Sequence, residues 1–159
     1  MILDQMIFDR TQADVDEVSQ LIEKGYQHMS VEEKRKWLTD MKGAINASDL
    51  NRVGEACHYI EQLLIAEDYF RMHTDAKVDI ESDGIYDELI LNEYVDSVLR
   101  FMKLIPSDLY EYIPANYDYV TYEDQNHIEK NLYLMPQVLR SIQDGMQVLS
   151  FTLGGDEFE

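Results

Sequence analysis

The feature that most constrains this chain is an apolar stripe that runs through residues 122–151 in unbroken steps of four and three. This spacing places the apolar side chains on one face of an α-helix, whereas a half-buried strand would alternate in steps of two. The stripe consists of Ile128, Leu132, Met135, Leu139, Ile142, Met146 and Leu149. We therefore predict a long last helix over about 122–151. Thr121 caps its start together with Asp124, and Pro136 kinks it because proline lacks a backbone amide hydrogen.

Similar spacing recurs in four earlier segments, most of which begin at a capping residue. The predicted helices span about 11–29, 31–42, 49–71 and 86–105, and their caps include Thr11, Ser30 and Ser48. Three prolines and seven glycines in 159 residues agree with long helices and few breaks. The sequence thus predicts an all-α fold, a compact antiparallel bundle of about five helices with a long Tyr-rich connection before the last one. We expect a single helical domain over 1–151 and an acidic C-terminal tail over 152–159.

The net charge restricts the partners that such a surface can bind. The chain has 13 basic and 32 acidic residues, a formal net charge of −19. Contacts to phosphates need lysine or arginine, so nucleic acid and anionic membranes are disfavoured as partners. Two interpretations remain: a soluble protein whose copies repel one another, or an acidic surface that imitates DNA and binds a basic partner.

Targeting and redox signals are sparse. The single cysteine, Cys57, excludes an internal disulfide and a cysteine-based zinc site. The N-terminal residues are acidic where a signal peptide needs basic ones, and no stretch approaches the roughly 20 apolar residues of a membrane-spanning helix. We expect a protein made in the cytoplasm and not exported by a standard route.

Residues 42–53, KGAINASDLNRV, concentrate the polar and glycine signals of the chain. They could form a binding loop, but almost every position has a structural interpretation as a corner between two helices. We predict that Gly43 ends one helix in a left-handed conformation and that Asn46 tolerates the bend. Ser48 then caps the next helix and Asp49 complements its positive end. Asn51 and Arg52 would tie the corner to nearby carbonyls or carboxylates.

No arrangement of residues indicates a catalytic centre, a metal site or a cofactor. Glu55 and His58 have the Glu-x-x-His spacing of di-iron bundles, and Asp124 and His127 form a weaker echo. A metal-dependent enzyme is therefore a third and weaker alternative. However, the apolar spacing directs Glu55 and His58 away from the core, where such ligands would have to lie.

Tyrosines between the last two predicted helices are the best candidates for a partner surface. The connection contains Tyr110, Tyr112, Tyr117 and Tyr119, and aromatic side chains are enriched in protein interfaces. They could instead pack on the bundle as a strap. We expect all four to be partly exposed.

The chain resembles a family of minor structural proteins, associated with tails or baseplates, from phages and prophages of Gram-positive bacteria. The family carries a tryptophan, a short gap and then Lys-Gly-Ala-Tyr-Asn-x-x-Asp-Leu-Asn-Arg-Val, and later a helix start in which a tyrosine precedes Asn-x-Ile-Glu-Lys. The first motif is matched by Trp37, Lys42, Gly43, Ala44, Asn46, Asp49, Leu50, Asn51, Arg52 and Val53, and the second by Tyr122, Asn126, Ile128, Glu129 and Lys130. Ile45 replaces the usual tyrosine, and the loop before Tyr122 lacks the family's Leu-Pro character.

The resemblance implies a non-enzymatic structural or adaptor component of a phage tail or baseplate. Its partners would be other phage structural proteins or further copies of itself, without nucleic acid, membrane or cofactor. Its location would be the cytoplasm of the bacterial host during assembly, and then the virion. The alternative from composition is an acidic regulatory protein that mimics DNA and binds a nucleic-acid-binding partner.

Overall fold

The fold is known from a computed structural model, which describes residues 1–69, 71–81, 88–117 and 120–154 (for residues 88 and 147–154, the backbone only). Two short 3₁₀ helices, η1 (Ile2–Gln5) and η2 (Tyr26–His28), accompany five α-helices. These are α1 (Gln12–Lys24), α2 (Val31–Trp37), α3 (Ala47–Ala66), α4 (Glu88–Leu104) and α5 (Tyr122–Gly154). The described residues contain no strand, so the predicted all-α bundle of about five helices is confirmed.

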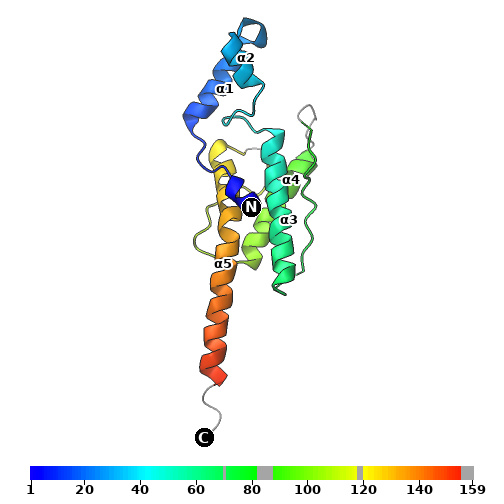
Figure 1. The fold of residues 1–159 in the computed structure, drawn as a ribbon, viewed down its shortest axis with the longest axis vertical. Coiled ribbons are helices and arrows are strands. Elements are labelled where there is room, and N and C mark those ends of the chain that lie inside the picture. The colour runs from blue at the N-terminus through cyan, green and yellow to red at the C-terminus, as the bar shows by residue number, and fades with distance from the viewer. Residues whose placement is uncertain (70, 82–87, 118–119, 155–159) are drawn as a thin grey trace.

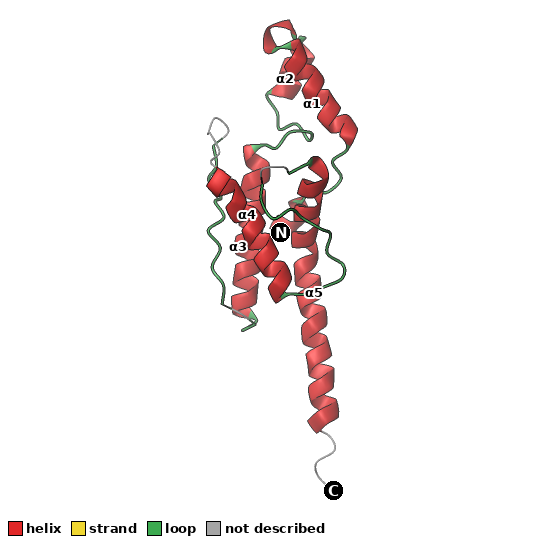
Figure 2. Cartoon of the chain, turned by 180° about the vertical axis from the view of Figure 1, so that it is seen from behind, coloured by secondary structure: helices red, strands yellow, loops and turns green. Residues whose placement is uncertain are grey.

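Helices α3, α4 and α5 form the body of the molecule, and each packs against the other two (Figures 1 and 2). The apolar stripe of each helix faces this shared core. Fully buried side chains include Val53, Ile60, Leu64, Val95, Val98, Phe101, Ile128, Leu132 and Met135. The N-terminal η1 also packs on α3 and α5, with Leu3 buried.

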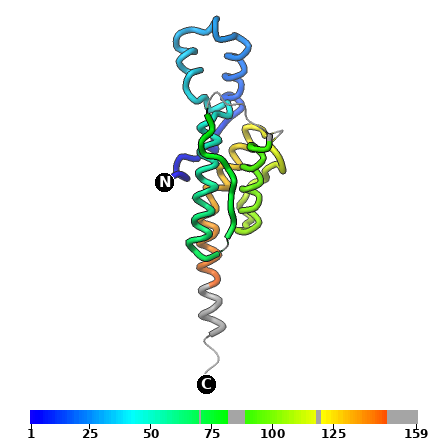
Figure 3. The backbone as a smooth tube through the Cα atoms, turned by 90° about the vertical axis from the view of Figure 1, so that its right-hand side faces the viewer, coloured from blue at the N-terminus to red at the C-terminus, as the bar shows by residue number. Residues whose placement is uncertain are grey.

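Helices α1 and α2 form a hairpin that projects beyond one end of this body (Figures 1 and 3). The predicted helix over 11–29 is interrupted because Gly25 has a φ of 74°, a left-handed conformation that ends α1 after Lys24. Ser30 begins α2 as predicted, with its backbone amide bonded to Glu33. The second predicted helix, over 31–42, was too long, because α2 ends at Trp37.

An extended segment, residues 71–81, lies along α3, which ends at Ala66 and not at residue 71 as predicted (Figure 3). Its backbone is held by side chains: Asn51 bonds both the amide and the carbonyl of Ile80, and Tyr94 donates to the carbonyl of Lys77. The Lys77 carbonyl comes so close to Gly54 that any Cβ there would overlap it. Glycine in the middle of α3 is thus required by the segment packed against it.

The long connection between α4 and α5 is confirmed, and α5 is longer than predicted. Asn131 bonds the backbone amide and carbonyl of Glu111, which fastens the connection to α5. Pro136 lies inside α5, as expected. This helix continues to Gly154, past the predicted domain end at residue 151, and residues 155–159 of the expected tail lie outside the described part of the chain.

Candidate functional site

Four charged side chains meet inside the body, below the junction with the hairpin. Arg10 Nη2 lies 2.8 Å from Asp49 Oδ1 and 2.8 Å from Glu129 Oε1. Arg52 Nη2 lies 3.0 Å from Glu129 Oε1 and also pairs with Asp49. The side chains of Arg10, Asp49, Arg52 and Glu129 are 2, 5, 11 and 0% exposed. We refer to these four residues as the charge cluster.

The charge cluster joins three separate parts of the chain. Arg10 comes from the segment before α1, Asp49 and Arg52 from the first turns of α3, and Glu129 from the second turn of α5. The backbone amide of Ile7 also donates to Glu129, at 2.7 Å. The cluster therefore fixes how the N-terminal segment and the starts of α3 and α5 meet.

Neutral polar groups extend the network around the cluster. Gln125 donates to Glu129 at 3.3 Å and accepts from the hydroxyl of Tyr117 at 2.8 Å. Asn126 accepts from the backbone amide of Arg10 and donates to its carbonyl. This pair of bonds holds the segment before α1 directly on α5.

The electrostatics of the cluster are those of a structural clamp. Two cations and two carboxylates sum to zero, which offsets part of the cost of burying each charge. Burial alone would lower the pKa of Arg52, but its bonds to Glu129 and Asp49 outweigh burial and raise the pKa above its ordinary value. Among the described residues, the groups bonded within this network are guanidinium groups, carboxylates, amides and one tyrosine hydroxyl, and its main feature is charge pairing.

The predicted corner is present, but Gly43, Asn46 and Ser48 have other roles than expected. The N-cap of α3 is Asn46, whose amide donates to Asp49 Oδ2 at 2.9 Å, and Ser48 lies within the first turn. Gly43 is not in the left-handed region and does not end a helix, because α2 stops at Trp37. A Cβ on Gly43 would overlap the backbone of Asp14 in α1, so glycine allows this close approach.

The remaining corner residues bind the partners that we expected. Asn51 ties the corner to a carbonyl and an amide of the extended segment, at Ile80. Arg52 pairs with acids, Asp49 in its own helix and Glu129 in α5. From the sequence, Arg10 and Glu129 were not identified as members of a buried charge cluster. One signal could have pointed to Glu129, since it belongs to the second motif of the resemblance and follows the apolar Ile128.

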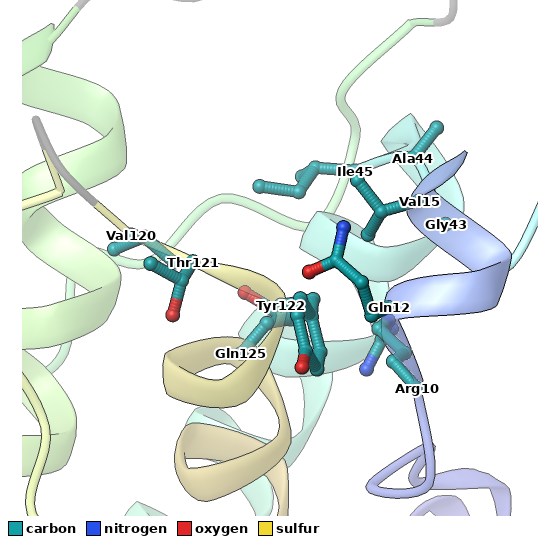
Figure 4. Close-up of a pocket in the computed structure, with 10 residues that line it drawn as sticks. All are labelled: Arg10, Gln12, Val15, Gly43, Ala44, Ile45, Val120, Thr121, Tyr122 and Gln125. Atoms are coloured by element: carbon teal, nitrogen blue, oxygen red, sulfur yellow. The ribbon is translucent and has the colours of Figure 1, made fainter. Parts of the chain in front are cut away.

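A pocket of about 510 Å³ opens beside the cluster, between the start of α1, the corner and the start of α5 (Figure 4). It is lined by Arg10, Gln12, Val15, Gly43, Ala44, Ile45, Val120, Thr121, Tyr122 and Gln125. Its walls are mostly apolar, and the two terminal nitrogens of the buried Arg10 guanidinium are already bonded to Ile7, Asp49 and Glu129, while its Nε has no partner among the described residues. The pocket suits an apolar side chain of a protein partner better than a charged small molecule.

The tyrosines that we expected to be partly exposed differ in their exposure. Tyr112 is 76% exposed and Tyr110 is half-buried, in agreement with the expectation. Tyr117 contradicts it, because this side chain is 8% exposed and its hydroxyl bonds Gln125 in the core. Tyr119 lies outside the described residues. The four tyrosines do not form one surface, since Tyr117 packs into the bundle, as the alternative of a strap predicts.

The two Glu-x-x-His-like pairs do not converge on a metal site. Glu55 is exposed, while His58 Nε2 lies 2.8 Å from the carbonyl oxygen of Ala76. Asp124 caps the start of α5 at Thr121, and His127 contacts the backbone of the tyrosine connection. Across the described part of the chain, no three His, Cys, Asp or Glu side chains are grouped as metal ligands would be.

A surface that the sequence patterns did not single out lies on the hairpin. Ile22, Val31 and Leu38 are 61, 85 and 74% exposed, and Tyr26 and Trp37 are also exposed. The hairpin and its linkers, residues 11–46, contain five basic and seven acidic residues, a net charge of −2. The rest of the chain contains eight basic and 25 acidic residues, a net charge of −17. The sequence predicted a longer second helix, over 31–42, so the shortness of α2 became visible only in the structure.

Comparison with known proteins gives no relative. No family model, curated protein or solved structure matches the chain. Among the helices that the structure describes, none is long and apolar enough to cross a membrane.

Proposed function

We propose that the chain is a non-enzymatic structural or adaptor component of a phage or prophage tail or baseplate, and that it acts through protein–protein contacts. Its partners are other phage structural proteins, which it meets in the cytoplasm of the bacterial host before it enters the virion. The proposal starts from the resemblance of residues 37–53 and 122–130 to that family. The observation that carries it furthest is the projecting hairpin.

The hairpin has the properties of a docking element. It exposes several large apolar side chains on a unit separate from the body, and such groups usually mark a protein interface. The charge cluster anchors its base, since Arg10 immediately precedes α1 and is bonded to α3 and α5. A docking element on a fixed base can bind a partner without reorganising the body.

The uneven charge supports the same assignment. A net charge near zero over the hairpin removes the repulsion that the strongly acidic body would present to an ordinary acidic partner. The body then keeps the free subunits apart from one another before assembly. The acidic surface could also serve the alternative function, in which the chain mimics DNA, but the projecting hairpin is much less acidic than the rest of the chain.

Co-expression with the proteins encoded beside the gene tests this proposal. We expect one of these structural proteins to co-purify with the chain, and we expect Val31→Glu to weaken that complex by at least tenfold. Gln20→Glu is the matched control, because it adds the same charge at an exposed polar position of α1 and should leave the complex intact. Failure of every neighbouring structural protein to bind, or capture of a nucleic-acid-binding protein that DNA displaces, would refute the proposal.

A further inference from the structure

The C-terminal part of α5 extends beyond the body of the molecule (Figures 1 and 2). A bond near the end of the body joins Gln143 Nε2 to Glu67 Oε2 at the C-terminal end of α3, at 3.1 Å. Eleven further residues of helix follow, up to Gly154. These turns continue α5 and need no new nucleation, but most helical stability in proteins comes from the packing of an apolar face, so a partner that covers this face would stabilise them.

The apolar stripe of α5 does not stop where the body stops. Leu139 is buried at 1% exposure, Ile142 is half-buried, and Met146 on the same face is 61% exposed. The sequence continues the spacing of threes and fours at residues 149 and 153. The apolar face that α5 buries inside the body therefore continues beyond it. There, the described part of this chain does not cover Met146.

This region is also the least charged long stretch of the chain. Residues 131–154 contain one basic and one acidic residue, Arg140 and Asp144; the projecting residues 144–154 contain Asp144 alone, a net charge of −1, and the sequence after them adds Asp156, Glu157 and Glu159. Arg140 and Asp144 are exposed and lie about 160° around the helix from Ile142, so neither occupies the apolar face. On a chain with a net charge of −19, the projecting helix itself thus adds little to the electrostatic repulsion between two copies.

We propose that the projecting part of α5 is a dimerisation surface that pairs with the same segment of a second copy of this chain. The contact is isologous, because one apolar stripe packs against its own symmetry mate. It is antiparallel, because that orientation puts the two acidic bodies at opposite ends of the paired helices. Eleven residues of helix separate them by about 16 Å, roughly twice the Debye length of about 8 Å at physiological ionic strength. A parallel pair would place the two bodies side by side.

Sedimentation equilibrium of the purified chain tests the proposal at two salt concentrations. We expect a monomer–dimer equilibrium that tightens as the salt concentration rises, because screening weakens the repulsion between the bodies while apolar packing is retained. Small-angle scattering should give the dimer a maximum dimension well above that of a monomeric variant, as an end-to-end antiparallel pair requires. Both measurements use this chain alone, so they can fail or succeed independently of the proposed phage function.

Substitutions of Met146 locate the contact. Met146→Glu and Met146→Lys should each weaken dimerisation by at least tenfold, since both place a charge in the apolar seam whatever its sign. Arg140→Gln changes the net charge by the same amount as Met146→Glu on the polar face, and it should stay within twofold of the original chain. Circular dichroism should show unchanged thermal unfolding of the monomeric body in all three variants.

Three results would overturn the proposal. A chain that stays monomeric at high salt and high concentration has no such surface. Dimerisation that survives both substitutions of Met146 lies elsewhere. A dimer that dissociates as salt rises is held by charge and not by this apolar stripe.

Discussion

Replacing Glu129 by glutamine tests whether the charge cluster holds the fold together. Glu129 is fully buried and accepts hydrogen bonds from Arg10, Arg52, Gln125 and the amide of Ile7. Glutamine has nearly the same shape but no charge. The substitution therefore leaves two buried guanidinium groups opposite the single carboxylate of Asp49, a net charge of +1 in the protein interior.

The expected effect is large because the remaining groups cannot reach water. Breaking a buried ion pair by removal of one partner typically costs about 3–5 kcal/mol, since it leaves a charge uncompensated. For a chain of this size, 1 kcal/mol corresponds to a shift in melting temperature of about 2–4 °C. We thus expect Glu129→Gln to lower the melting temperature by roughly 10 °C.

Thermal and urea unfolding, followed by circular dichroism, measure this change, and the chain offers a matched control. Glu111→Gln removes a carboxylate that pairs with Lys130 where both side chains are more than 40% exposed, and such pairs contribute at most about 1 kcal/mol. Replacing Arg52 by methionine in the Glu129→Gln background rebalances the cluster, so the double variant should be more stable than additivity predicts. If Glu129→Gln is no more destabilising than Glu111→Gln, our account of the cluster is wrong.

Three further predictions concern other parts of the molecule. Gly54→Ala should destabilise the protein by about 1–3 kcal/mol because the new methyl group overlaps the packed segment, whereas Gly145→Ala, with open space around it, should stabilise α5 by up to about 1 kcal/mol in the same unfolding assay. The bond from Glu61 raises the pKa of His73 above its ordinary value of 6.5. This contribution to stability is therefore complete below pH 6.5 and is lost as the pH rises through the raised pKa, and NMR titration should show that Glu61→Gln lowers that pKa. Burial raises the pKa of Cys57 to about 12, so its thiol should react with a disulfide reagent at pH 8 only after unfolding, and rapid labelling of the folded protein would contradict its burial.

The helical class of the protein is encoded locally and could be predicted from the sequence. The spacing of apolar residues in α3, α4 and α5 depends only on helix geometry, and the same residues form the core in the structure. The starts of α1, α2 and α5 were also predicted, because the caps at Thr11, Ser30 and Thr121 bond residues three positions away. Such interactions are complete within a short stretch of sequence.

The ends of the helices depended on contacts that local sequence does not describe. The apolar spacing continues past Gly25, but the left-handed backbone there breaks the helix before Tyr26. The helix predicted to reach residue 71 stops at Ala66, and the extended segment that follows is held by Asn51 and His58 of α3. The path of the segment is set by hydrogen bonds between residues 18 and 29 positions apart. The spacing of apolar residues contains no information about such bonds.

The sequence by itself determined the all-helical class and the main core faces, and it indicated that Arg52 pairs with a carboxylate or with backbone carbonyls. Tertiary structure alone decided that Arg10 and Glu129, 119 residues apart, share one buried cluster with the corner. It also decided that α1 and α2 project from the body as a hairpin and that α5 extends beyond α3 and α4. The physical reason is that apolar periodicity specifies which face of a helix avoids water, whereas the partner that covers this face is set by chain connectivity and by the pairing of buried charges.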